Sequence, residues 1–131
     1  MREITEREIP IINHLMKEAK VFVEHIYEAL LKIKSYTNGL NRDSFLANSL
    51  VQDAVIRNLE LIGVASKNIQ DDFKKKYDKI EWNKMSGMRH KLNHDFIGVD
   101  LWAIWALIDK ILPGLESQIS EIIIQESSST H

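Results

Sequence analysis

The apolar residues of this chain recur at steps of three and four along most of its length. Near the N-terminus they are Ile12, Leu15, Met16, Ala19, Phe22, Val23, Ile26, Leu30 and Ile33. This spacing places them on one face of an α-helix. Strict alternation of apolar and polar residues, which a half-buried strand needs, does not persist anywhere in the chain. The pattern therefore predicts an all-α fold.

Four helices joined by short links are expected, and they favour an up-and-down four-helix bundle. The predicted helices cover about residues 9–36, 43–73, 83–95 and 100–124. Asp100 is expected to cap the fourth helix. Pro113 lies inside that helix and should kink it, because its ring removes a hydrogen-bond donor and clashes with the preceding turn. We expect a single domain over residues 1–124 and a flexible tail over residues 125–131.

The composition excludes several classes of protein. The chain has 131 residues, of which 44% are hydrophobic and 27% charged, as in an ordinary globular domain. Its net charge of −2 argues against a protein that coats nucleic acid by bulk charge. It has no cysteine, no apolar signal core at the N-terminus and no apolar run of the ~20 residues that span a bilayer. We therefore expect a cytoplasmic protein without a membrane anchor.

The residues best suited to chemistry are concentrated in one short stretch. Arg89, His90, Asn93, His94 and Asp95 fall within seven positions and are flanked by apolar residues. The Arg89 guanidinium is a permanent cation with a planar set of donors that suits a phosphate. The His94 imidazole can accept or donate a proton near neutral pH. A cation and a base within reach of one another are the minimum needed to cleave a phosphodiester without a metal.

Helix geometry alone does not place this pair on one face. Five residues of continuous helix would set Arg89 and His94 about 140° apart, although a long arginine can bend towards a histidine one turn on. His90 and His94, or Arg89 and Asn93, are four residues apart and would share a face.

The stretch resembles the signature of the HEPN superfamily. Arg89, four residues and His94 are followed by Phe96 and by Gly98-Val99-Asp100. The closest likeness is to the HepT-like toxins, whose pattern is Met-Arg-Asn, three residues, His, any residue, Tyr-Phe-Gly, any residue, Asp. Further landmarks extend the likeness from about Glu18 to Ile119: Phe45, Ala54-Val55-Ile56-Arg57-Asn58-Leu59, Ile62-Gly63, Ala65, Trp82, Gly87-Met88, Trp105 and Leu112-Pro113-Gly114-Leu115.

The resemblance implies a metal-independent endoribonuclease that needs no cofactor. His94 would act as acid or base, and Arg89 would stabilise the phosphate. His90, Asn93 and Asp95 would support the site or bind RNA. The resemblance further implies a homodimer with the active cleft between subunits, an RNA and not a DNA substrate, and a cognate nucleotidyltransferase as antitoxin.

Three positions depart from the family pattern. Phe96 stands where HepT-like proteins usually carry a tyrosine, which the antitoxin adenylylates in the best-understood members. Phenylalanine has no hydroxyl to modify, so this route of silencing is in question at this position. His90 replaces the preferred asparagine, and Val64 stands where glutamate is frequent.

Two other functions remain open from the residues. The chain could be a non-catalytic HEPN module that binds a nucleotide or a nucleotidyltransferase partner. His90 and His94, four residues apart with Asp95 adjacent, also match a helical metal site.

Two further features of the sequence have a structural interpretation and a functional one. Trp82, Trp102 and Trp105 are expected to serve core or interface packing and not base stacking. The charged run over residues 71–79 is expected to be a solvated helix end, with a small basic RNA-binding lip as the alternative.

Overall fold

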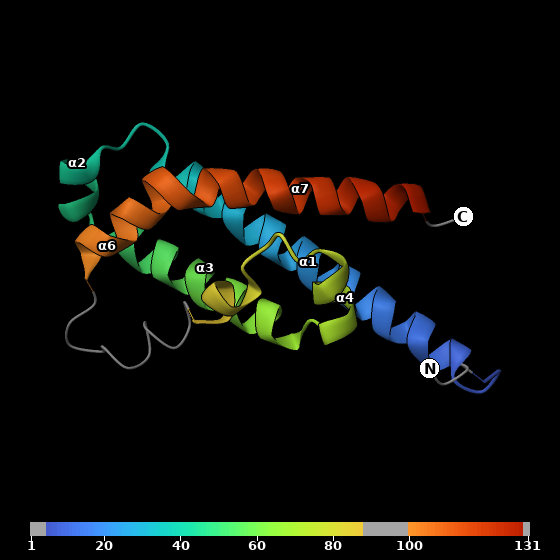
Figure 1. Ribbon diagram of the computed structural model, residues 1–131. Coiled ribbons are helices and arrows are strands. Elements are labelled where there is room, and N and C mark those ends of the chain that lie inside the picture. Colours follow the sequence, from blue (N-terminus) through green and yellow to red (C-terminus); the bar gives the residue numbers. More distant parts are fainter. Residues whose placement is uncertain (1–4, 88–99, 130–131) are drawn as a thin grey trace.

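The computed structural model describes residues 5–87 and 100–129, without the side chains of residues 11–17 and 129. Within these ranges every regular element is a helix, so the predicted all-α class is confirmed. The helices form a bundle (Figure 1), in which α1 packs against α3 and α7. α1 spans Ile9–Thr37, α3 spans Ser49–Asn68 and α7 spans Leu112–Ser129.

The first helix agrees with its predicted range of 9–36 to within one residue. Pro10 lies in its first turn, where a missing backbone N–H costs nothing. The helix ends at Thr37, and Gly39 in the turn that follows has a φ of 77°, a conformation that glycine adopts without strain. The predicted apolar stripe forms the buried face of α1 through Ala19, Val23, Ile26, Leu30 and Ile33.

The single helix predicted over residues 43–73 is wrong. The structure divides this stretch into α2 (Arg42–Leu46), α3 (Ser49–Asn68) and α4 (Asp71–Lys76). Apolar residues continue at helical spacing across both breaks, so periodicity alone did not reveal them.

Two asparagine side chains account for where α2 and α3 begin. The Asn41 side chain accepts the backbone N–H of Ser44, and the Ser44 hydroxyl accepts the backbone N–H of Asn41 in return. The Asn48 side chain accepts the backbone N–H of Val51 at 3.1 Å. Each asparagine satisfies a donor that the start of a helix leaves without a partner, so each favours a new helix start.

The third predicted helix, 83–95, is described only in part. Residues 82–87 are helical, and the remainder of the predicted range lies outside the described residues. The fourth begins as expected, because the Asp100 carboxylate accepts the backbone N–H of Ala103 at 3.1 Å at the start of α6 (Leu101–Ala106). The residues that the structure describes thus contain more helical segments than the four expected, although the helical bundle is confirmed.

The irregularity expected at Pro113 is present and takes a specific form. A π-helical turn, η1 (Leu107–Ile111), lies between α6 and α7, and the Leu112 N–H donates to the Leu107 carbonyl. This wider turn precedes the proline, whose ring would clash with the carbonyl four residues earlier in a regular α-helix. The chain changes direction between α6 and α7 (Figure 1).

The end of the fourth helix differs from the prediction. The helix was expected to end at Ile124 and to be followed by a flexible tail from residue 125, but α7 continues to Ser129. Glu126 lies inside this extension and is buried. The extension is stabilised by contacts with α4 that the local sequence does not indicate.

One hydrophobic core unites the described helices. Its members come from α1, α2, α3, α4, the 82–87 helix, α6, η1 and α7. The most deeply buried side chains include Phe45, Phe73, Ile26, Ile62 and Ile119. The short elements α2 and α4 each contribute one buried phenylalanine, so both are held by packing and not by helix propensity.

Candidate functional site

The residues predicted to carry the chemistry lie outside the described part of the chain. Arg89, His90, Asn93, His94 and Asp95 all fall within residues 88–99, as does Phe96. Their geometry therefore stays a prediction. The structure does describe the two elements between which this segment runs, the 82–87 helix and α6.

The 82–87 helix is held to α3 and to the turn after α4. The buried Trp82 donates its indole Nε1–H to the Tyr77 carbonyl at 3.0 Å. The Ser66 hydroxyl, fully buried on α3, donates to the Trp82 carbonyl at 3.3 Å. Ser66 and Ser86 share a hydrogen bond between their hydroxyls at 3.3 Å. Met85 is buried beside them, so the chain enters the candidate site from a well-packed helix.

The other end of the segment leads into α6. Trp105 packs against the buried Phe45 of α2, with ring centroids 5.4 Å apart. Trp102 is 58% exposed, and the Arg42 guanidinium lies 4.4 Å from its ring centroid. The packing role expected of the tryptophans therefore holds for Trp82 and Trp105, but Trp102 is not part of the core.

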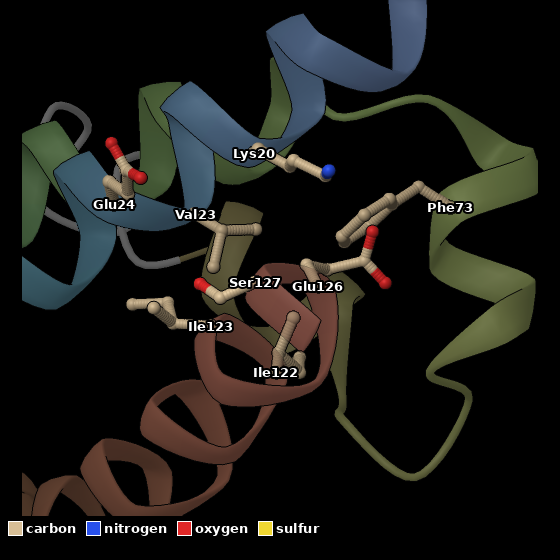
Figure 2. Close-up of a pocket in the computed structure, with 8 residues that line it drawn as sticks. All are labelled: Lys20, Val23, Glu24, Phe73, Ile122, Ile123, Glu126 and Ser127. Carbon is tan, nitrogen blue, oxygen red and sulfur yellow. The ribbon is translucent and has the colours of Figure 1, made fainter. Parts of the chain in front are cut away.

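A polar cluster that the sequence analysis missed lies where α7 meets α4. The buried Glu126 carboxylate accepts hydrogen bonds from the Lys76 ammonium at 2.8 Å and from the Tyr77 hydroxyl. It borders a pocket of about 280 Å³ between α1, α4 and α7. Figure 2 shows Lys20, Phe73 and Glu126 meeting at this pocket from those three helices. Glu126 follows Ile119 and Ile122 at steps of three and four, which is the signal that could have placed it on the buried face.

The cluster changes the acidity of two groups. Burial by itself would raise the pKa of Glu126, but hydrogen bonds from Lys76 and Tyr77 and the charges of Lys76 and Lys20 lower it overall. Burial, together with the hydrogen bond and the charge of Glu126, raises the pKa of Tyr77 well above its ordinary value. At neutral pH the cluster therefore holds an ionised Glu126 carboxylate and a neutral Tyr77 phenol.

Comparison with known proteins identifies the family. Residues 26–122 match the family model described as "Ribonuclease HepT-like". The chain belongs to the ribonuclease HepT-like family.

Curated relatives of this HepT-like chain carry ribonuclease names. "Probable ribonuclease HepT" of Thermococcus cleftensis is 37% identical over 108 residues, 82% of this chain and 98% of that protein. "Putative RNase TTE0752" of Caldanaerobacter subterraneus subsp. tengcongensis is 35% identical over 111 residues, 85% of this chain and 99% of that protein. No solved structure gives a significant match.

A longer relative matches over part of its length. "Gamma-glutamylcyclotransferase and putative RNase MJ0434" of Methanocaldococcus jannaschii is 37% identical over 109 residues, 83% of this chain and 49% of that protein. The HepT-like chain thus spans about half the length of this relative.

Membership of the HepT-like family confirms the resemblance on which the sequence analysis relied. It also confirms the ribonuclease class of enzyme that was expected. Among the residues that the structure describes, no three histidine, cysteine, aspartate or glutamate side chains are grouped as metal ligands. The alternative metal site at His90, His94 and Asp95 lies outside those residues.

The charged run over residues 71–79 forms the short, mostly exposed helix α4 and the turn that follows it at residues 77–79. Asp71 and Asp72 lie in the first turn of α4, and Lys74, Lys75 and Lys76 lie in its last turn. This order complements the helix dipole. Lys76 makes the ion pair with Glu126, so at least one lysine of the run has a structural partner. No helix in the described part of the chain is long and apolar enough to cross a bilayer.

Proposed function

We propose that this HepT-like chain is a metal-independent endoribonuclease whose reaction depends on Arg89 and His94. The observation that carries the proposal is the family match over residues 26–122, a range that contains both residues. The ribonuclease names of relatives that align over more than 80% of the chain support it.

The proposed reaction is an internal transesterification of RNA. His94 removes the proton from a ribose 2′-hydroxyl, and that oxygen attacks the adjacent phosphorus. Arg89 binds the non-bridging oxygens, where negative charge increases in the transition state. The bond from phosphorus to the 5′-oxygen breaks, and this oxygen takes a proton from an acid. The products are a 2′,3′-cyclic phosphate and a 5′-hydroxyl.

The acid that protonates the leaving oxygen has to be a second group, because one histidine cannot serve both positions at once. His90 is one candidate, and His94 of the partner subunit is the other. The second assignment requires a homodimer, which we include in the proposal. Asn93 and Asp95 are assigned supporting contacts to the substrate or to the two histidines.

We further propose that the chain acts as the toxin of a pair with a nucleotidyltransferase antitoxin. Phe96 bears on how the antitoxin would silence it. Because phenylalanine has no hydroxyl, the antitoxin cannot transfer a nucleotidyl group to position 96, and silencing depends on another residue or on binding alone.

The test uses purified full-length protein, RNA and EDTA. We expect cleavage in the presence of EDTA and a 2′,3′-cyclic phosphate end. We expect Arg89→Ala and His94→Ala each to reduce kcat/KM by roughly 10²–10⁴-fold, the usual range for an acid–base group or a transition-state contact.

Two exposed residues outside the motif provide matched controls. His25→Ala and Arg57→Ala remove the same side-chain types from exposed positions on α1 and α3 and should leave activity unchanged. A wild-type protein that binds RNA or a nucleotidyltransferase but does not cleave would contradict the proposal and favour the non-catalytic module. Light scattering that shows a strict monomer would exclude His94 of the partner subunit as the acid.

A further inference from the structure

The buried carboxylate of Glu126 connects the last helix to the turn after α4. Glu126 is 5% exposed, and its Oε2 atom accepts the Lys76 Nζ–H at 2.8 Å and the Tyr77 hydroxyl. Lys76 is the last residue of α4, and Tyr77 follows it directly. A charge buried to this extent needs its partners, because it would otherwise lose its solvation without compensation. Glu126 therefore holds this turn against α7.

This turn also holds the 82–87 helix, which leads along the chain into the candidate site. The backbone carbonyl of Tyr77 accepts the indole N–H of Trp82 at 3.0 Å, and Trp82 is buried. Tyr77 thus contacts Glu126 through its side chain and Trp82 through its main chain. Hydrogen bonds from Ser66 to Trp82 and between Ser66 and Ser86 complete the attachment of the 82–87 helix to α3.

The described part of this helix reaches residue 87, two positions before Arg89 in the sequence. The contacts that begin at Glu126 therefore extend to the helix that directly precedes, in the sequence, the segment to which we assign Arg89 and His94. Catalysis by a positioned cation and base depends strongly on geometry, and a displacement of about 1 Å can cost about 10²-fold in rate. A displacement of residues 77–87 should therefore lower kcat more than it changes KM.

We propose that Glu126 is a positioning residue for the ribonuclease site, acting through Tyr77 and Trp82 on the 82–87 helix. The inference rests on the proposed function of Arg89 and His94. It assigns a role in catalysis to a residue near the C-terminus that does not itself touch the substrate.

The positioning role of Glu126 depends on the negative charge of its carboxylate as well as on the size of the side chain. Lys20 of α1 and Lys76 of α4 provide positive charge around the carboxylate, and Glu24 is on the wall of the same pocket (Figure 2). A glutamine at this position would keep the size of the side chain but lose the attraction to both lysines. The glutamine amide would also place its own N–H group near the Lys76 and Tyr77 donors, so the hydrogen bond from the Tyr77 hydroxyl should weaken.

The experiment compares Glu126→Gln, Tyr77→Phe and the control Glu121→Gln, which removes an exposed carboxylate from the same helix. Circular dichroism first establishes a temperature at which all variants are folded. RNA cleavage with EDTA then gives kcat and KM, and hydrogen exchange follows the amides of residues 77–87. We expect kcat to fall about tenfold or more in Glu126→Gln and Tyr77→Phe, with KM changed less than twofold, the direction that misplacement of the reacting groups predicts.

The same two variants should show faster exchange in residues 77–87, with α1 and α3 unchanged. The double variant should lose little more kcat than either single variant, because both changes interrupt one set of contacts. Glu121→Gln should match the wild type in every measurement.

Three results would overturn the inference. Unchanged kcat and exchange in Glu126→Gln, in a wild type whose activity requires His94, would reject the positioning role and leave the ribonuclease proposal standing. A fall in activity that matches the fraction of unfolded protein would reduce Glu126 to a purely structural role. A wild type with no His94-dependent cleavage would remove the ribonuclease proposal and this inference together.

Discussion

Glu126 occupies a position that the pattern of α7 would give to an apolar side chain. Leu115, Ile119 and Ile122 form the buried face of this helix, and Glu126 continues it one turn on. The carboxylate is tolerated there because Lys76 and Tyr77 donate to it and Lys20 adds positive charge. Burial opposes ionisation, but these contacts outweigh it and lower the pKa of Glu126 overall.

The lowered pKa predicts a stability that depends on acid pH. A carboxyl whose pKa is lower in the folded state contributes stability that is present above its unfolded pKa and is lost as pH falls through its folded pKa. We expect Glu126→Gln to reduce the free energy of unfolding by about 1.5–3 kcal/mol at pH 7, the usual value of a hydrogen bond to a charged group. The difference from wild type should shrink as pH falls below 4.5, the ordinary pKa of this side chain.

Urea unfolding at a series of pH values between 7 and 3 measures this difference. Glu121→Gln, an exposed change on the same helix, should give a small difference at every pH. A difference between Glu126→Gln and wild type that stays constant over the whole range would show that ionised Glu126 does not supply the stability.

At the scale of the elements, short side-chain contacts decide where helices begin. Asn48 divides a stretch whose apolar spacing is continuous, and Asn41 lies just before the start of that stretch. Each accepts a backbone N–H group at a helix start. Pro113 acts differently, since it is preceded by the wider η1 turn and the helix continues beyond it. Asp100 is an expected cap that the structure confirms.

The cap of α3 gives a prediction at this scale. Asn48→Ala removes the acceptor for the Val51 N–H and should lower the free energy of unfolding by about 0.5–2 kcal/mol. Asn48→Ser should keep most of the stability, because serine is a cap of similar strength. Chemical denaturation of the three proteins provides the measurement, and an alanine variant as stable as wild type would show that the cap is not needed.

At the scale of the whole molecule, the core connects segments that are distant in the sequence. Phe45 of α2 is fully buried and packs against Trp105 of α6, and Glu126 of α7 contacts Lys76 at the end of α4. The first contact joins two short helices and the second joins α4 to the long helix α7, so short helices that would not be stable alone are held within the bundle. The elements that precede and follow residues 88–99 in the sequence, the 82–87 helix and α6, both contribute to this core.

Phe45 gives a prediction at this scale. Phe45→Ala should lower the free energy of unfolding by about 3–5 kcal/mol, because it removes a buried ring and leaves a cavity between α2 and α6. Leu50→Ala, at a position 79% exposed, should change it by less than about 0.5 kcal/mol. Urea unfolding curves compare the two, and similar small losses in both would contradict a core that includes α2.

Several features predicted from the sequence are present in the structure. The apolar stripe of α1, the Asp100 cap, the irregularity near Pro113 and the all-α class agree with the structure. The breaks around α2 and α4 and the helical end of α7 were not predicted. The positions of Arg89 and His94 remain predictions, because both lie outside the described residues.

The sequence by itself determined the helical class, the buried face of α1 and the family motif, since these depend on residue type and local spacing. Only the tertiary structure decided that Glu126 is buried, that Trp102 is exposed and that Tyr77 connects α7 to the helix before Arg89. The physical reason is that helical periodicity reports which face is apolar and contains no information on which distant segment covers that face.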